Sequence, residues 1–286
     1  MRGFGSLLLG TVLNRPYVFV FLTCYLVAAV TKMGWLRTAA FTVLAFTVAF
    51  AAEFSSTRNG FPFGLYHYID TTRSQELWLS NVPVWDSLSF AFLCYLGFQL
   101  AVLLYSPLEV RRRDVQVLDT IEIRGSLRVL ITGAALMTIL DVVIDPLTVR
   151  GDRWFLGQVY YYPQGGLYFG VPPSNFAGWF LVGLVTIGAY QRIERRLLAP
   201  TPLLRSGQAH LPFGGLFEPV LYLAIVIFNV ALTLWIGETL LATIAFFIFA
   251  PLTLVYAANL IAPANRATAS EREAHRRDFP RTRAFA

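Results

Sequence analysis

The sequence is poor in charged residues, and this absence excludes an ordinary soluble domain. Only 14% of its 286 residues are charged, whereas 56% are hydrophobic and 15% are aromatic. Soluble domains carry about 25% charged residues. The hydrophobic residues here also come in long blocks, so the composition indicates an integral membrane protein.

Cysteine, histidine and lysine are scarce as well. The two cysteines, Cys24 and Cys94, both fall inside apolar blocks, and they form neither a CxxC motif nor a disulfide framework. The three histidines are scattered without the spacing of metal ligands, so we expect no metal site. The only lysine, Lys32, lies near the end of the first apolar block. A retinal protein needs a Schiff-base lysine in its last helix, so this class is excluded.

Long apolar blocks are the dominant feature of the chain. A helical membrane span needs about 20 mainly apolar residues, within a range of roughly 17–25. The alternation over about ten residues that is typical of membrane β-strands is absent. The blocks predict an all-α bundle of about seven transmembrane helices, over Pro16–Val30, Leu36–Phe54, Val84–Tyr105, Leu127–Ile144, Asn175–Tyr190, Phe217–Ile236 and Thr239–Ile261. We expect residues 1–261 to form a single transmembrane catalytic domain and residues 262–286 to form a polar, disordered tail.

Basic residues predict the orientation of the bundle. With seven spans, the N-terminus and three connections lie on one side, which holds six of the 23 basic residues: Arg2, Arg15, Arg58, Arg73, Arg150 and Arg153. The other side holds the remaining 17, including the Arg111–Arg113 run and the cluster between Arg272 and Arg283. By the positive-inside rule the C-terminus is cytoplasmic, in a multi-pass protein of the inner (plasma) membrane. The net charge of +6 is therefore a topology signal, and we expect no nucleic acid as a partner.

Four acidic residues lie at the ends of predicted spans on the face opposite the arginine-rich one. Glu53 ends the second span, Asp86 opens the third, and Asp141 and Asp145 end the fourth. A charge at the bilayer centre costs roughly 2.5–3.5 kcal/mol on insertion scales. Such residues usually face the interior of a bundle and have a functional role, so these four are candidates for the active site.

Asp141 and Asp145 lie four residues apart in "ILDVVIDP", so they share one helix face about 5–6 Å apart. Pro146 predicts that the helix ends or kinks at Asp145, which places Asp141 about one turn deeper. Two close carboxylates in a low-dielectric site do not both ionise cheaply, and a retained proton suits general acid–base catalysis. We predict that Asp141 donates the proton and that Asp145 orients and deprotonates water. Glu53 is the reserve candidate for either role.

Each of these acids also has a structural interpretation. Arg150 and Arg153 follow the two aspartates on the same face and would pair with them, while Asp145-Pro146 would be only a helix-ending turn. Asp86 would complement the positive end of its helix. These interpretations stay open at the level of sequence.

Two connections at the acidic face are rich in Gly, Pro and aromatic residues: "EFSSTRNGFPFGLYHYIDTT" and "DPLTVRGDRWFLGQVYYYPQGGLYFGVPPSNFAGW". Loops of this length are usually lids, binding elements or disordered segments, and the aromatic content argues against disorder. Aromatic residues gather at bilayer interfaces in any case. In the functional interpretation, their faces line a slot for a long apolar substrate and stabilise a cation there, by about 2 kcal/mol or more when desolvated.

Four stretches follow one another over most of residues 50–185: "AEFSSTRNGFPFGLYHY" (52–68), "NVPVWDSLSFAF" (81–92), "DVVIDP" (141–146) and "YFGVPPSNFAGWFLVG" (168–183). In this order and spacing they resemble the membrane carotenoid-biosynthesis hydratase family, which includes the γ-carotene 1′-hydratases and the bisanhydrobacterioruberin hydratases. The last two predicted helices match this family only as apolar spans.

The resemblance implies a cofactor-free hydro-lyase that adds water across the terminal 1,2 double bond of an acyclic ψ-end, as in lycopene or γ-carotene. Its partners would be a carotenoid dissolved in the bilayer, water and other enzymes of the carotenoid pathway. The loops and the resemblance together predict these substrate-binding residues: Tyr66, Tyr68, Trp85, Asp86, Trp154, Tyr168, Asn175 and Trp179.

Other functions are compatible with some of these features. A carotenoid cyclase also begins by protonating a ψ-end, but an alkene rather than water captures its cation. A proton-coupled transporter would use intramembrane carboxylates, and a pigment-binding scaffold would use the aromatic residues. A magnesium-dependent prenyltransferase is disfavoured because "DVVID" lacks the NDxxD spacing and no second Asp-rich motif follows.

Overall fold

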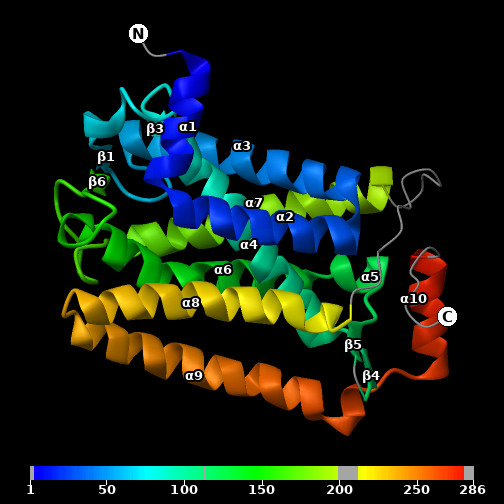
Figure 1. Cartoon of the computed structure of the whole chain (residues 1–286). Helices are drawn as coiled ribbons and strands as arrows, with labels where there is room; N and C mark the ends of the chain where they lie inside the picture. Colours follow the sequence, from blue (N-terminus) through cyan, green and yellow to red (C-terminus); the bar gives the residue numbers. More distant parts are fainter. Residues whose placement is uncertain (1–2, 113, 199–211, 280–286) are drawn as a thin grey trace.

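The computed structural model describes residues 3–112, 114–198 and 212–279. Within these residues, seven helices are long and apolar enough to cross a membrane, and they run side by side (Figure 1). They are α2 (Pro16–Met33), α3 (Trp35–Asn59), α4 (Val84–Tyr105), α6 (Leu127–Thr148), α7 (Pro173–Ile193), α8 (Phe217–Trp235) and α9 (Thr239–Ile261). The predicted helical bundle is confirmed, and the predicted bounds of α4 and α9 match the observed ones.

Of the two outcomes predicted at Asp145, a helix end or a kink, the helix end is wrong. The helix does not end at Asp145 but continues through Pro146 for two more residues. The Arg150 guanidinium donates to the Pro146 carbonyl oxygen at 3.0 Å. The Trp154 indole donates to the Leu147 carbonyl oxygen at 3.1 Å. These loop side chains satisfy two of the carbonyl groups that a helix end leaves unpaired.

The central helix of the bundle is α4, which is buried over most of its length. Small residues let α4, α6 and α7 approach one another closely. Between α4 and α6, a Cβ atom added at Gly97 would lie 2.4 Å from the Gly133 carbonyl oxygen. Between α7 and α6, a Cβ atom added at Gly183 would lie 3.0 Å from the Cα atom of Ala134. Close contacts of this kind are common between membrane helices. They hold together the three helices that carry Asp86, Asp141, Asp145 and Asn175.

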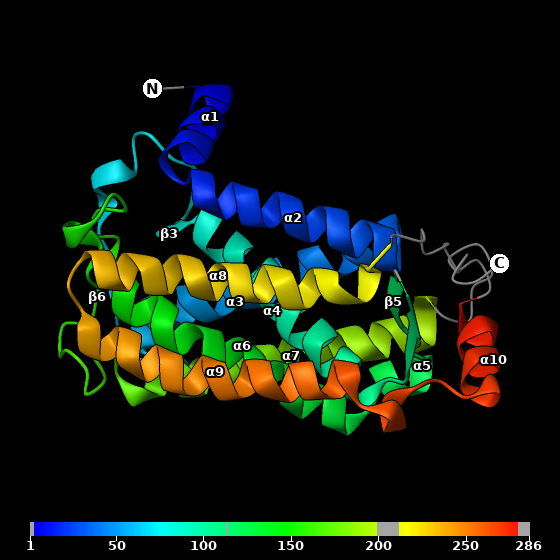
Figure 2. The same ribbon diagram turned by 60° about the horizontal axis from the view of Figure 1, so that its bottom comes forward.

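The two aromatic loops lie together at one end of the bundle, and the arginine-rich connections lie at the other end (Figures 1 and 2). In the first loop, β1 (His67–Tyr68) pairs antiparallel with β6 (Tyr160–Tyr161) of the second loop. The first loop also contains η1 (Asp70–Thr72) and the pair β2 (Trp78–Leu79) and β3 (Val82–Pro83). The opposite end contains β4 (Leu108–Arg111), β5 (Asp114–Val117) and α5 (Ile121–Arg124).

Like α5, the helices α1 (Phe4–Asn14) and α10 (Ala269–Asp278) lie outside the predicted spans. Helix α10 differs from the disorder expected for the tail. Thr268 and Glu271 form a capping box at the start of α10, and His275 is buried with its Nδ1 atom 2.6 Å from the Asp119 carbonyl oxygen. Residues 280–286 of the tail lie outside the described residues, as do five of the 23 basic residues considered for topology: Arg2, Arg113, Arg205, Arg281 and Arg283.

Candidate active site

The four acidic residues come together beneath the paired loops. Glu53 lies near the end of α3, Asp86 in the first turn of α4, and Asp141 and Asp145 in the last two turns of α6. Glu53, Asp141 and Asp145 are buried. The four carboxyl groups form two bridged pairs, one held by a tyrosine and the other by an asparagine.

Tyr68 bridges Glu53 and Asp86. Its hydroxyl oxygen lies 2.8 Å from Glu53 Oε1 and 2.6 Å from Asp86 Oδ2, and the Ser87 hydroxyl donates to Glu53 Oε2. A tyrosine hydroxyl carries one hydrogen, so it donates to only one of these two carboxyl groups. The other contact is a hydrogen bond only if that carboxyl group supplies the hydrogen. The bridge therefore holds one acid proton. When the protonated carboxyl group gives its hydrogen to the Tyr68 oxygen and the Tyr68 hydroxyl gives its own hydrogen to the other carboxylate, this proton moves between Glu53 and Asp86.

The tyrosines around the acids stay protonated. Burial raises the pKa of Tyr68 well above its ordinary value, and the Asp86 and Glu53 carboxylates raise it further. Burial raises the pKa of Tyr160 in the same way, with the Asp145 carboxylate as the next cause. The Tyr68 hydroxyl group therefore acts as a hydrogen-bond donor to the acids over the physiological pH range.

Asn175 bridges Asp141 and Asp145 from the first turn of α7. Its Nδ2 atom donates to one oxygen of each carboxyl group, at 2.7 Å in both cases. An amide nitrogen carries two hydrogens, so both contacts are satisfied at once. The Tyr162 hydroxyl donates to Asn175 Oδ1 at 3.0 Å. This bridge fixes the two aspartates in position, but an amide does not readily pass a proton between them.

The structure shows other partners for the two arginines that follow the aspartates. Arg150 Nε lies 2.9 Å from Glu238 Oε1, and Arg153 pairs with the same carboxylate. The hydrogen bond from Arg150 lowers the pKa of Glu238. Among the described residues, no arginine lies within salt-bridge distance of Asp141 or Asp145. The interpretation in which Arg150 and Arg153 neutralise the aspartates is therefore wrong.

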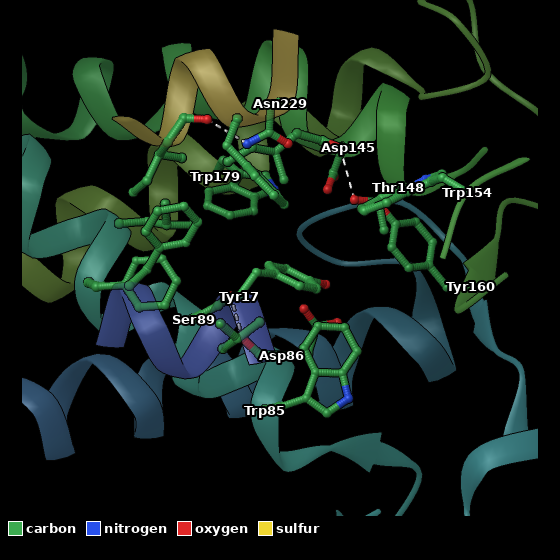
Figure 3. Close-up of a pocket in the computed structure, with 17 residues that line it drawn as sticks. Tyr17, Trp85, Asp86, Ser89, Asp145, Thr148, Trp154, Tyr160, Trp179 and Asn229 are labelled. Atoms are coloured by element: carbon green, nitrogen blue, oxygen red, sulfur yellow. Dashed lines mark hydrogen bonds between the residues drawn. The ribbon is translucent and has the colours of Figure 1, made fainter. Parts of the chain in front are cut away.

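Two cavities meet at the acids. The first, of about 300 Å³, is named the polar chamber and is lined by Glu53, Phe63, Tyr66, Tyr68, Asp86, Phe90, Asp145, Tyr160, Tyr162, Asn175 and Trp179. The second, of about 660 Å³, is named the apolar chamber and is lined mainly by aromatic and aliphatic side chains of α2, α4, α6 and α8 (Figure 3). Asp86, Asp145, Tyr160 and Trp179 line both chambers.

Several polar groups in the wall of the apolar chamber are already bonded to the protein. Ser89, Thr148 and Asn229 each donate to a backbone carbonyl oxygen of their own helix, at 2.7, 2.9 and 2.8 Å. The Trp154 indole donates to a backbone carbonyl oxygen as well. These donors have no need of water, so the chamber is suited to a hydrocarbon. The carboxyl groups that remain in its wall are those of Asp86 and Asp145.

Most of the predicted site residues lie around the two chambers. Those that line at least one of them are Glu53, Tyr66, Tyr68, Trp85, Asp86, Asp145, Trp154, Asn175 and Trp179. Asp141 lines neither chamber and is fully buried behind Asn175. Tyr168 also lines neither, and its ring packs against Phe169 and Phe176.

Several residues of the site were not predicted from the sequence. Tyr160 and Tyr162 are buried while Tyr161 between them is 42% exposed, so the alternation of an extended strand was the signal that separates them. Tyr17 and Phe228 line the apolar chamber from ordinary apolar spans. Nothing in their local sequence distinguishes them from residues that face lipid.

A family model described as "Carotenoid biosynthesis protein" matches residues 13–252. The match includes every residue that lines the two chambers. The search of curated proteins and the search of solved structures found no match.

Proposed function

This chain belongs to the carotenoid biosynthesis protein family, and we propose that it hydrates the terminal 1,2 double bond of an acyclic carotenoid ψ-end. The observation that carries the proposal is the meeting of an apolar and a polar chamber at Asp86 and Asp145. Hydration brings together a hydrocarbon alkene, an acid and water. A site with one chamber for the alkene, one for water and carboxyl groups between them supports this reaction.

In this proposal the isopropylidene end of the carotenoid occupies the apolar chamber. The rings of Trp85, Trp154 and Trp179 surround this space together with Tyr17 (Figure 3). Burial of the apolar end favours binding, and the aromatic faces stabilise a cation that forms there. The reacting carbons then lie beside Asp86 and Asp145.

Asp86 is the proposed proton donor. It receives an acid proton from Glu53 through the Tyr68 hydroxyl and gives it to the less substituted carbon of the double bond. The O–H bond of the acid and the π bond of the alkene break, and a new C–H bond forms. The product of this step is a tertiary carbocation, with the positive charge on the carbon that carries the two methyl groups.

Asp145 is the proposed base for the second step. It orients a water molecule from the polar chamber, and this water forms a C–O bond to the cation while its proton passes to Asp145. The product is a tertiary alcohol, and proton return from Asp145 to the Glu53–Asp86 pair through solvent in the polar chamber resets the site. No electrons are gained or lost, so the proposal includes no cofactor.

Asp141 receives a different role from the one predicted from the sequence. Because it lines neither chamber, it does not reach the alkene directly. It holds Asn175, which in turn holds Asp145, so we assign Asp141 as a positioning residue. Asp86 takes the role of proton donor, and Glu53 supplies its proton.

The experiment that tests the proposal is expression in a lycopene-producing bacterium followed by mass spectrometry of the pigments. Hydration adds about 18 mass units per modified end. The expected result is this gain with the wild-type protein and unchanged lycopene with Asp145→Asn at an equal membrane level. An isomer of unchanged mass would identify a cyclase instead, and unmodified pigment that co-purifies with the protein would identify a scaffold.

The proposal also includes the location and partners of the protein. A carotenoid already dissolved in the bilayer reaches the site without leaving the membrane. We propose an inner-membrane protein with a cytoplasmic C-terminus, working beside other enzymes that supply acyclic carotenoids.

A further inference from the structure

Rings from α2 and α8 form one wall of the apolar chamber. Tyr17 and Phe21 come from α2 and Phe228 from α8, two helices that pack against each other. Tyr17 stacks on Phe228 with ring centroids 5.5 Å apart. Phe21 meets Phe228 edge to face at 5.7 Å. These three residues are named the aromatic seam, because their rings meet between the two helices.

The aromatic seam separates the apolar chamber from the lipid-facing surface. Its three residues are half-buried, whereas the neighbouring Val20 and Ile227 are 58% and 65% exposed on the outside of the bundle. Figure 2 shows α2 and α8 as neighbours at this surface. The seam residues therefore contact the chamber on one side and the hydrocarbon layer on the other.

A long substrate cannot fit inside the apolar chamber. An extended acyclic carotenoid is comparable in length to the hydrocarbon core, which is about 30 Å thick. Tyr17 and Phe21 lie four positions apart on α2, or about 6 Å along the helix axis. Only the reacting end of the substrate therefore lies beside Asp86 and Asp145. The rest of the chain must leave the chamber.

We propose that the conjugated chain leaves through the aromatic seam, with Phe228 as a residue that selects a flat polyene. This inference rests on the proposed function, since it assumes that the occupant is a carotenoid. A conjugated chain is rigid and planar, so it stacks on ring faces along its length. A saturated isoprenoid of the same length is puckered and makes fewer such contacts. Exit at the seam also leads the chain directly into lipid, where it is already soluble.

The experiment compares Phe228→Leu, which keeps apolar volume but removes the ring, with Phe228→Tyr, which keeps the ring. Ile227→Ala on the lipid-facing side of the same helix is the matched control. Binding is followed with lycopene in nanodiscs by the visible circular dichroism that an achiral polyene acquires in a fixed site. Turnover is followed with lycopene and with a short acyclic isoprenoid that has the same isopropylidene end.

Loss of one stacked ring should weaken lycopene binding by Phe228→Leu about threefold to tenfold, and turnover of lycopene should fall more than turnover of the short substrate. Phe228→Tyr and Ile227→Ala should both bind lycopene normally. Phe21→Leu gives a second test if Phe228→Leu does not fold. Unchanged lycopene binding in the Leu variants, or an equal loss with both substrates, overturns the inference. A wild-type protein that binds lycopene but hydrates neither substrate overturns the proposed function instead.

Discussion

The Tyr68 hydroxyl oxygen lies 2.6 Å from Asp86 Oδ2, across the boundary between a loop and a membrane helix. On its other side the same hydroxyl contacts Glu53. This contact places a hydrogen-bonded link between a carboxyl group of the polar chamber and one that also faces the apolar chamber. Its removal tests whether the link passes a proton.

Tyr68→Phe keeps the ring but removes the link between the two acids. Because Asp86 then loses its proton supply, we expect turnover to fall by about 10²–10⁴-fold, the range typical of general acid catalysis. Turnover in membranes with quantified protein is the measurement. Tyr161→Phe is the control, because Tyr161 is exposed on the same strand pair. Full activity of Tyr68→Phe would show that the proton reaches Asp86 by another route.

The two aspartates of α6 should respond differently to replacement by asparagine. Asp145→Asn removes a carboxylate that faces both chambers, so we expect no detectable product. Asp141→Asn leaves Asp145 in place and loosens only the Asn175 bridge, so we expect a partial loss of turnover. Product yield at matched membrane levels is the measurement. The reverse order of effects would return the donor role to Asp141.

Local sequence rules predicted the parts of this site that lie on one helix or at its ends. The spacing of Asp141 and Asp145 gave their shared face, and block length gave the bounds of α4. The Tyr68 bridge joins residues 15 and 18 positions away, and no local rule predicts how a loop folds back on two helices. Likewise Arg150 pairs with Glu238, 88 positions away, rather than with the nearby aspartates.

Trp179 should stabilise the carbocation, because it lines both chambers and stacks on Phe90 with centroids 4.2 Å apart. Loss of a cation–π contact of about 2 kcal/mol corresponds to roughly a 30-fold drop in turnover for Trp179→Leu. Trp179→Phe keeps an aromatic face and should lose less. Trp235→Leu is the control at an exposed position. Equal turnover by the Leu and Phe variants of Trp179 would argue for a packing role.

Arg15 should be a main anchor of the first loop. Its guanidinium is buried, lies 2.8 Å from Glu76 Oε1, and donates to the Leu156 carbonyl oxygen at 2.7 Å. Arg15→Leu leaves the Glu76 carboxylate buried without its cation, which typically costs about 3–5 kcal/mol. We expect a lower thermal midpoint in detergent. The double variant Arg15→Leu/Glu76→Leu should recover part of this loss, and no recovery would mean that the charge pair is not the cause.

Glu238 should make the contact between the second aromatic loop and the α8–α9 turn sensitive to acid. The hydrogen bond from Arg150 lowers the pKa of Glu238 in the folded protein, so the ionised form is favoured by folding. This contribution is fully present above the unfolded pKa of about 4.3, and it is lost as the pH falls through the lower folded value. Glu238→Gln should therefore reduce the thermal midpoint at neutral pH, and its difference from the wild type should shrink in acid. The control is Asp152→Asn, at an exposed position in the same loop. A deficit of Glu238→Gln that stays constant from neutral pH into acid would mean that its cause is lost packing rather than lost charge.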